Sequence, residues 1–298
     1  MSPFTSKHAY TILERACRET GEVFPGAELL RIGENAIFRL AGRSSAIVVR
    51  VGRDAGRLPI AERELCFSRW LGGNGAVPVA RVHEEIPDQP RMVDGHPVTF
   101  WRYVEPQPDQ PTAVDLAGIL RKLHAFSTSP CDLPPFDPLF NVRARLRHGL
   151  GLTNDDRDFL GSRCEAVGAA LPELEFELPP GPIHGDAHTG NLLGGRGAAV
   201  LSDFEVCATG PREWDLVPVA VGRARLGIST QQWQDFVAAY GFDVCAWSGY
   251  PVLREARELG MTTWLAQNAA ESEDIAREVA LRIRSLRDGD HGRTWTAF

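Results

Sequence analysis

One segment, residues 182–204, limits most strongly what this chain can fold into. It reads PIHGDAHTGNLLGGRGAAVLSDF and contains Asp186, then Asn191, then Asp203. Two short apolar runs flank the glycine-rich GGRG turn, so they are expected to pair as a hairpin. Such a hairpin would place Asn191 and Asp203 nearly opposite each other at its open end, with Asp186 just upstream.

These three side chains match the needs of phosphoryl transfer. Mg²⁺ prefers hard oxygen ligands, and Asn191 and Asp203 offer an amide and a carboxylate oxygen. Asp186 would orient an acceptor hydroxyl and accept its proton. The spacing from Asp186 to Asn191 is that of the kinase catalytic-loop pattern H-x-D-x-x-x-x-N.

A metal-hydrolase site is the competing interpretation of the same segment. His184, Asp186 and His188 alternate along the chain and would share one face of a strand. That site would need further His or carboxylate ligands at compatible spacing. The remaining histidines do not offer them, so the kinase interpretation is favoured.

The composition excludes several classes of protein. The chain has 298 residues, a formal net charge of −7, 43% hydrophobic and 24% charged residues, which is typical of a globular protein. An acidic balance without a basic block argues against nucleic acid as a partner. The 6 cysteines are scattered without C-x-x-C spacing, which predicts neither a disulfide framework nor a zinc site. Since no signal-like or membrane-spanning apolar run occurs, we expect a reduced, cytoplasmic protein away from membranes.

The order of the predicted elements indicates an α+β fold with two lobes. Strands are expected at 35–40, 46–51, 78–82 and 98–104, with a helix at 60–71. The proline-rich EPQPDQPT stretch that follows is the best boundary. Helices are expected at 114–126, 145–171, 214–226, 230–240, 252–268 and 272–286. The predicted lobes are therefore 1–104, rich in strands, and 105–298, mostly helical.

The sequence resembles the aminoglycoside phosphotransferase (APH-type) family of small-molecule kinases, which has a protein-kinase-like fold. The motifs that carry the resemblance are HGDAHTGN, SDFE, GPREWDL, LRKLHAF and WRYVEP, and they span roughly residues 30–290. The resemblance implies a small nucleotide-binding N-lobe with one main helix and a larger lobe for catalysis and acceptor binding.

The resemblance also implies a role for each matching residue. Asp186 would be the catalytic base, and Asn191 and Asp203 would be Mg²⁺ ligands. His184 would brace the loop by hydrogen bonding, and Asp215 would buttress it from below. An acid near a helix N-terminus that interacts with the helix dipole is the simpler interpretation of Asp215, and both can hold.

The chain departs from the protein-kinase pattern at the phosphate-binding lysine. Its only lysines, Lys7 and Lys122, lie outside the predicted strands of the small lobe. Arg50 in the strand IVVRV would hold the phosphates instead, because a guanidinium is always charged and binds phosphate with two hydrogen bonds. Glu64 is the expected partner of Arg50, with Glu62 as its rival. A solvated strand residue is the alternative interpretation of Arg50.

The remaining nucleotide contacts are expected to come from the backbone. The loop around Gly33 and Asn35 has one glycine in place of G-x-G-x-x-G, and a plain β-turn explains it equally well. Backbone groups around Tyr103 and Val104 would bind adenine at the hinge. Since EWDL follows closely after the DFE motif, no activation segment is evident, and we expect constitutive activity.

The predicted function is therefore an ATP- (or GTP-) and Mg²⁺-dependent phosphotransferase acting on a small-molecule hydroxyl. Aminoglycosides, sugars, macrolides, amino alcohols and nucleoside antibiotics are all acceptor candidates, and the sequence does not indicate the oligomeric state. A pseudokinase-like module that binds nucleotide or ligand without transfer is the alternative, supported by the missing lysine, and a protein kinase is a third option.

The residues considered as acceptor-pocket walls are Glu205, Arg212, Trp264, Glu271, Glu273 and Asp274, although an acidic cluster at 271–274 is more simply a solvated helix face.

Overall fold

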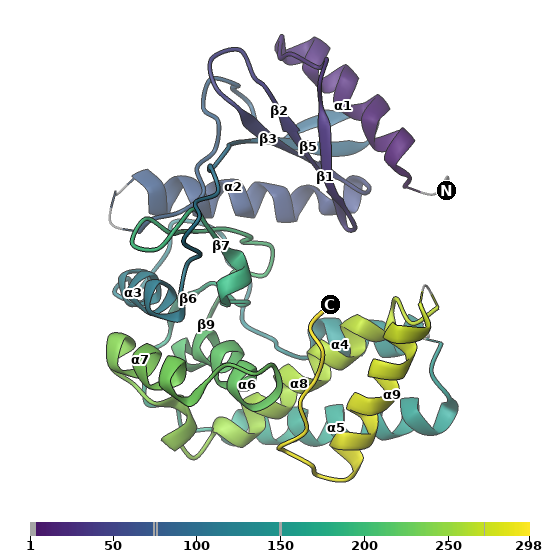
Figure 1. The fold of residues 1–298 in the computed structure, drawn as a ribbon, viewed down its shortest axis with the longest axis vertical. Coiled ribbons are helices and arrows are strands. Elements are labelled where there is room, and N and C mark those ends of the chain that lie inside the picture. The colour runs from purple at the N-terminus through teal and green to yellow at the C-terminus, as the bar shows by residue number, and fades with distance from the viewer. Residues whose placement is uncertain (1–3, 74, 76, 149–150, 271) are drawn as a thin grey trace. The chain divides into compact units, whose positions relative to one another are not determined.

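The computed structural model describes residues 4–73, 75, 77–148, 151–270 and 272–298 (Figure 1). It contains two compact units. The first comprises Met1–Asp115, Thr128–Leu133 and Thr189–Cys207, and the second comprises Leu116–Ser127, Pro134–His188 and Ala208–Phe298. The segment 182–204 is thus divided between them. The predicted lobe boundary after residue 104 stays a prediction. Each compact unit is made of three separate stretches of the chain.

A five-stranded antiparallel sheet forms the centre of the first unit. Its strand order is β1-β2-β3-β5-β4. The strands are β1 (Glu28–Ile32), β2 (Asn35–Leu40), β3 (Ile47–Gly52), β4 (Arg91–Val93) and β5 (His96–Arg102). Side chains alternate along β3, so that Val49 and Val51 point to one face and Arg50 to the other.

Helix α1 (Ser6–Thr20) covers the face of the sheet to which Val49 and Val51 point. Its apolar residues recur at helical spacing and pack against buried strand residues such as Phe38 and Phe100. The Thr5 side chain caps the helix N-terminus by accepting the N–H of His8. Gly21, in the left-handed region with φ 75°, ends the helix.

Helix α2 (Leu58–Gly73) lies against the other face of the sheet. Its Leu65 packs with Val48 and Trp101, which come from β3 and β5. A short 3-10 helix, η1 (Ala55–Arg57), leads into α2, and Asp54 caps it. The helix predicted at 60–71 is therefore present, and its residues reach the face that carries Arg50.

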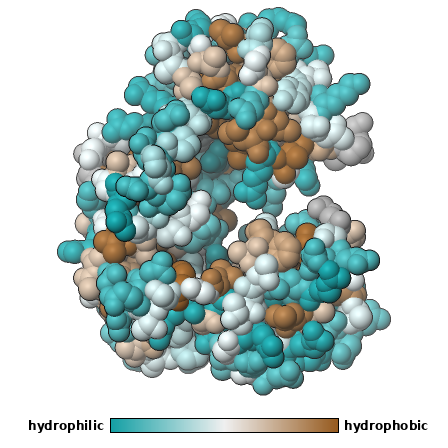
Figure 2. Space-filling view, in the orientation of Figure 1, coloured by the Kyte–Doolittle hydropathy of each residue, from teal (hydrophilic) through white to brown (hydrophobic). Residues whose placement is uncertain are grey.

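The first unit exposes apolar side chains on its edge strand β1. Figure 2 shows hydrophobic residues gathered in the region where Figure 1 places β1. Leu30 and Ile32 of this strand are exposed. The edge strand thus presents an apolar surface directly before the turn at Gly33.

The predicted hairpin forms part of the first unit. It consists of η3 (Thr189–Asn191), β7 (Leu192–Leu193) and β8 (Val200–Leu201), and Leu192 pairs with Leu201. The segment predicted as a strand at 78–82 forms no regular strand. It makes single β-bridges instead, one from Val79 to Leu201 of β8 and one from Val82 to Trp101 of β5. Because its two ends pair with different strands, it forms no continuous ladder with either.

The second unit is mostly helical. Its helices are α3 (Ala113–Leu123), which begins at the end of the first unit, α4 (Phe140–His148), α5 (Asn154–Ala170), α6 (Val217–Arg225), α7 (Thr230–Tyr240), α8 (Tyr250–Ala266) and α9 (Glu273–Arg287). Short 3-10 turns lie at η2 (Leu171–Glu173), η4 (Arg212–Leu216) and η5 (Val244–Ala246), and β6 (Gly181–Ile183) pairs with β9 (Ala208–Gly210). Helix α8 contacts α4, α5, α6 and α9, so it is the central helix of this unit.

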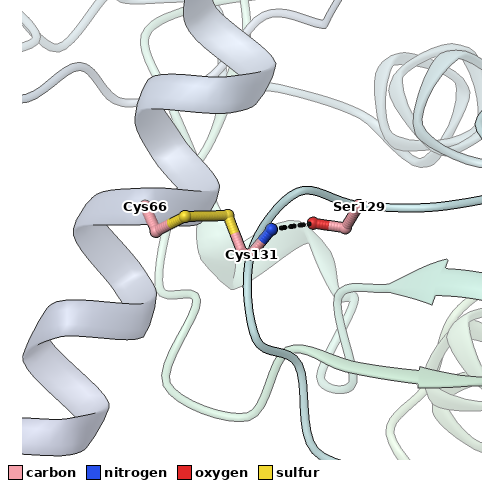
Figure 3. The surroundings of a disulfide bond; sticks show 3 residues. All are labelled: Cys66, Ser129 and Cys131. Atoms are coloured by element: carbon pink, nitrogen blue, oxygen red, sulfur yellow. Dashed lines mark hydrogen bonds between the residues drawn. A yellow bond between two sulfur atoms is a disulfide. The ribbon is translucent and has the colours of Figure 1, made fainter.

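The cysteines contradict the expectation of a fully reduced chain. Cys66 of α2 forms a disulfide with Cys131, and both belong to the first unit (Figure 3). The backbone N–H of Cys131 donates to the Ser129 side chain. Because the two cysteines are 65 residues apart, sequence spacing carries no sign of the pair, and the fold alone brings them together.

The predicted fold class is confirmed. The chain is α+β, with a five-stranded antiparallel sheet and a helix in its N-terminal part and a mostly helical C-terminal part. Across the described residues, no helix is both long and apolar enough to cross a membrane.

Candidate active site

Arg50 and Glu64 form a buried ion pair in the first unit. Arg50 points from β3 toward α2, and its Nη1 lies 2.8 Å from Oε1 of Glu64. The guanidinium also lies over the Trp101 ring, 5.3 Å from the ring centroid. Both side chains are largely shielded from solvent. The expected partner of Arg50 is therefore present, and the rival Glu62 is not its partner.

The surroundings of this pair shift both pKa values. Burial raises the pKa of Glu64 to about 7, although the Arg50 guanidinium opposes that shift. Burial alone would lower the pKa of Arg50, but the carboxylates of Glu64, Asp203 and Glu205 raise it. Arg50 is thus a permanent cation, and Glu64 is the member of the pair that can titrate near neutral pH.

The turn at Gly33 is short and open. The Gly33 N–H donates to the Asn35 carbonyl at 3.0 Å, and the Gly33 carbonyl accepts from Arg53. A Cβ added at position 33 would meet no protein atom within 4 Å, and φ there lies outside the left-handed region. The fold itself therefore does not require glycine at this position.

Glu205 of the DFE motif is held within the first unit. Its carboxylate accepts hydrogen bonds from Asn35 of β2 and from Arg57 of η1, with 2.6 Å to Nη2 of Arg57. Its backbone carbonyl accepts from Arg63 of α2. Glu205 therefore ties the DFE segment to the turn and to α2 and is not an open wall residue.

The strand end at Tyr103 and Val104 lies beside the hairpin. The N–H groups of Arg102 and Tyr103 donate to the carbonyls of Arg81 and Ala46. Val104 and the residues after it share a cavity of about 450 Å³ with the hairpin turn at Gly194–Arg196. The backbone at this strand end thus borders an open space in the first unit.

The hairpin register places Asn191 and Asp203 at its open end. After the pair Leu192–Leu201, the Asn191 carbonyl accepts hydrogen bonds from both the backbone N–H and the side chain of Ser202, each at 2.9 Å. Asp203 follows with φ 66°, in a region that non-glycine residues rarely adopt. Such conformations concentrate at functional sites, where the surroundings enforce them.

The donor set at this end fits a hard divalent cation. Asn191 and Asp203 offer neutral and charged oxygen ligands, and no thiol or imidazole intervenes between them in the hairpin. In the part of the chain that the structure describes, no group of three or more His, Cys, Asp or Glu residues could hold a metal. A hydrolase-type cluster around His184, Asp186 and His188 is therefore absent from that part.

In the second unit, Asp215 holds the loop that carries Asp186. Its two carboxylate oxygens accept the backbone N–H groups of His184 and Gly185, each at 2.7 Å. His124 of the LRKLHAF segment contacts the same carboxylate at 3.0 Å and Tyr240 at 2.8 Å. Asp215 and His184 are fully buried. The resemblance implied both the buttress at Asp215 and the brace at His184, but sequence reasoning gave His124 no role.

The loop fixes Asp186 from within. The Asp186 N–H donates to Nδ1 of His184, and the Gly185 carbonyl accepts from the Trp214 indole. Nη1 of Arg257, from α8, lies 2.6 Å from Oδ1 of Asp186, and His188 lies 3.6 Å from the other carboxylate oxygen. Although burial would raise the pKa of Asp186, Arg257 and His188 hold it well below its ordinary value. Asp186 is therefore a carboxylate at neutral pH.

Residues 29–259 match the model of the phosphotransferase enzyme family APH. The chain belongs to this family. It is an APH-family small-molecule kinase with the nucleotide-binding fold of that family. Among curated proteins, none matches this sequence closely enough to indicate a relative.

Solved structures confirm the fold. The microcompartment-associated aminopropanol kinase superposes with a TM-score of 0.73 at 20% identity, over 95% of this chain and 98% of that one. The amicoumacin kinase in complex with AMP-PNP, Ca²⁺ and Ami gives 0.69 at 13% identity, over 94% and 93%. An aminoglycoside-3′-phosphotransferase of type VIII gives 0.61 at 22% identity, over 85% and 99%.

The residues considered as acceptor walls in the second unit have differing surroundings. Arg212 donates to the Phe126 carbonyl, and Trp264 of α8 is partly exposed. Glu273 and Asp274 are exposed and pair with Arg277, as a solvated helix face does. Glu271 lies outside the described residues. The basic residue at Asp186, Arg257, was not predicted, because its partner is far away in the sequence and no local motif marks it.

Proposed function

We propose that this kinase transfers the γ-phosphoryl group of ATP or GTP to a hydroxyl group of a small molecule, with Mg²⁺ as the metal. In this reaction the acceptor hydroxyl oxygen forms a bond to the γ-phosphorus while the bond to the β–γ bridging oxygen breaks. The hydroxyl proton passes to Asp186, and the electron pair of the broken bond leaves with the nucleoside diphosphate.

The Arg50–Glu64 pair is the observation that carries this proposal. The missing lysine was the main support for a module that binds nucleotide without transfer. A buried guanidinium on β3, oriented by an acid on α2, supplies the cation that the phosphates need. The pair therefore favours an active enzyme over the binding module.

Asn191 and Asp203 would hold the metal. When bound, Mg²⁺ would neutralise the negative charge of the phosphates. The complex of the amicoumacin kinase with AMP-PNP and Ca²⁺ supports a nucleotide together with a divalent cation in this fold. The oxygen-only donor pair at the end of the hairpin suits either ion, and Mg²⁺ is the expected one.

The nucleotide would bind to the first unit. The turn at Gly33 is open, because an added Cβ there would meet no protein atom within 4 Å, and this leaves room for a phosphate. The Gly33 N–H itself is already bonded to the Asn35 carbonyl. Adenine or guanine would contact the backbone of Tyr103 and Val104. Because the Tyr103 N–H is already bonded to Ala46, its carbonyl and the Val104 backbone are the groups we assign to the base.

An acceptor screen tests the proposal. Purified protein with Mg²⁺ and ATP or GTP is assayed for release of diphosphate against aminoglycosides, sugars, macrolides, amino alcohols and nucleosides, and ³¹P NMR identifies the phosphate ester. We expect ester formation that EDTA abolishes and that Asp203→Asn reduces strongly. Tight nucleotide binding without ester from any acceptor would instead favour the binding module.

A further inference from the structure

Two nitrogen-bearing side chains lie close to the Asp186 carboxylate within the second unit. Arg257 contacts one carboxylate oxygen at 2.6 Å, and His188 lies 3.6 Å from the other. A base that stands alone creates a negative field, which attracts a cationic acceptor. In this protein the guanidinium of Arg257 on α8, which is always charged, reduces that negative field at the Asp186 oxygen that it contacts.

The acidic residues beside Arg257 on α8 are committed elsewhere. Glu255 pairs with Arg163 of α5, and Glu258 pairs with Arg225 and Arg254. The exposed acids Glu273 and Asp274 pair with Arg277 on their own helix. Each of these acids therefore has another basic partner, and Arg257 forms its ion pair with Asp186.

Arg257 is positioned to bind a second anion. Its helix packs against four others and is therefore a rigid support. The side chain is 20% exposed, so it is not sealed from solvent. A guanidinium has five N–H donors, and its contact with Asp186 uses one of its nitrogens. The Nε of Arg257 is buried without a hydrogen-bond partner among the described residues, so an acceptor carboxylate would be bound through the terminal nitrogens.

We propose that Arg257 selects acceptors that carry a carboxylate near the hydroxyl to be phosphorylated, which makes it a specificity-determining residue. The inference rests on the function proposed above. The acceptor carboxylate would bind to Arg257, and the hydroxyl would then hydrogen-bond to Asp186. An ammonium group at the same place would be repelled by Arg257.

The chemical step is unchanged by this inference. The hydroxyl oxygen forms its bond to phosphorus, the proton moves to Asp186, and the nucleoside diphosphate leaves. Arg257 takes no proton, because its guanidinium stays charged throughout. Arg257 contributes to the binding and orientation of the acceptor. Removing its guanidinium should therefore raise KM for carboxylate acceptors far more than KM for acceptors without a carboxylate.

Matched acceptors test the inference. Glycerate, glycerol and aminopropanediol share one carbon skeleton and differ in charge, and glucuronate, glucose and glucosamine form a second set. We expect the carboxylate member of at least one set to be phosphorylated with the highest kcat/KM. Arg257→Gln should raise KM for that acceptor about ten- to hundredfold, as loss of a charge-assisted contact does, and Arg257→Lys should recover part of it.

Arg163→Gln is the matched control, because it removes a cation that pairs with α8 through Glu255 and does not contact Asp186. We expect it to leave the preference unchanged. Nucleotide binding, measured by calorimetry, and thermal unfolding show that each variant is folded. A general loss of structure would change all acceptors alike, whereas the inference predicts a change in the ratio between carboxylate and neutral acceptors.

Two results would overturn the inference. One is a preference for the ammonium acceptors that Arg257→Gln does not alter. The other is transfer to neutral or cationic acceptors with none to any carboxylate. Both leave the kinase function intact. If the protein binds no nucleotide at all, the proposed function itself fails and the inference fails with it.

Discussion

At the scale of single residues, the site is built from ion pairs whose members lie far apart in the sequence. Arg50 and Glu64 are joined in the first unit, and Asp186 and Arg257 in the second. The first pair could be predicted, because a strand and the next helix suggest which acid faces which cation. The second could not, since Arg257 lies on a helix whose neighbours only the folded chain defines.

Glu64 makes stability depend on pH in a specific direction. Its pKa is about 7 in the folded protein, against 4.5 ordinarily. Between these values the folded protein retains a proton that the unfolded chain has released, so the free energy of unfolding falls as pH rises. The expected loss is about 3 kcal/mol across the window.

Urea unfolding of the wild type and of Glu64→Gln at several pH values measures this effect. Glutamine cannot titrate, so the wild type should lose stability relative to the variant as pH rises from 4.5 to 7. A difference in unfolding free energy that stays constant over this range would show that Glu64 titrates normally.

Gly33 offers a second test at this scale. A Cβ here would meet no protein atom within 4 Å and φ lies outside the left-handed region, so Gly33→Val should leave the unfolding midpoint nearly unchanged. If the turn amides bind phosphate, the valine side chain should weaken nucleotide binding about tenfold or more, as judged by calorimetry. Gly73→Val, at another open position in α2, is a control for the substitution itself. Equal nucleotide affinity in wild type and Gly33→Val would contradict a phosphate role for this turn.

At the scale of elements, the sequence was informative where patterns are local. The hairpin at 192–201 was predicted because two apolar runs flank a glycine-rich turn, and the structure contains it, with Leu192 paired to Leu201. The predicted strand at 78–82 was wrong, because its apolar residues pair singly with Leu201 and Trp101 and not with one continuous partner. Helix α1 and strands β1 and β4 were not predicted, although α1 completes the core of the sheet.

The disulfide is the element-scale feature that sequence spacing could not indicate. It attaches α2, the helix that carries Glu64, to the segment 128–133. Closing a loop of 65 residues restricts the unfolded chain and is expected to stabilise the fold by about 4 kcal/mol.

Chemical unfolding with and without a dithiol reductant tests this contribution. We expect the reductant to lower the urea midpoint of the wild type. The double variant Cys66→Ala/Cys131→Ala lacks the bond, so its midpoint should already be lower and should not respond to the reductant. Wild-type midpoints that coincide under both conditions would contradict a stabilising disulfide.

At the scale of the whole molecule, family membership and fold establish a small-molecule kinase and leave its acceptor open. The matched family region covers most of the chain, and the similar structures share the fold at 22% identity or less. Local motifs were sufficient to predict the family, because the catalytic loop and the DFE hairpin are contiguous in the sequence. The acceptor-binding residue that we propose, Arg257, lies on a helix far along the chain from Asp186, and no contiguous motif records their pairing.

The most direct test of the account is Asp186→Asn, assayed for both nucleotide binding and phosphoryl transfer. Asparagine keeps the shape of the side chain and removes its charge and its capacity to accept the hydroxyl proton. We predict that transfer falls about 10²- to 10⁴-fold, while the nucleotide dissociation constant measured by calorimetry changes less than about threefold. Transfer at the wild-type rate by this variant would contradict the assignment of Asp186 as the catalytic base.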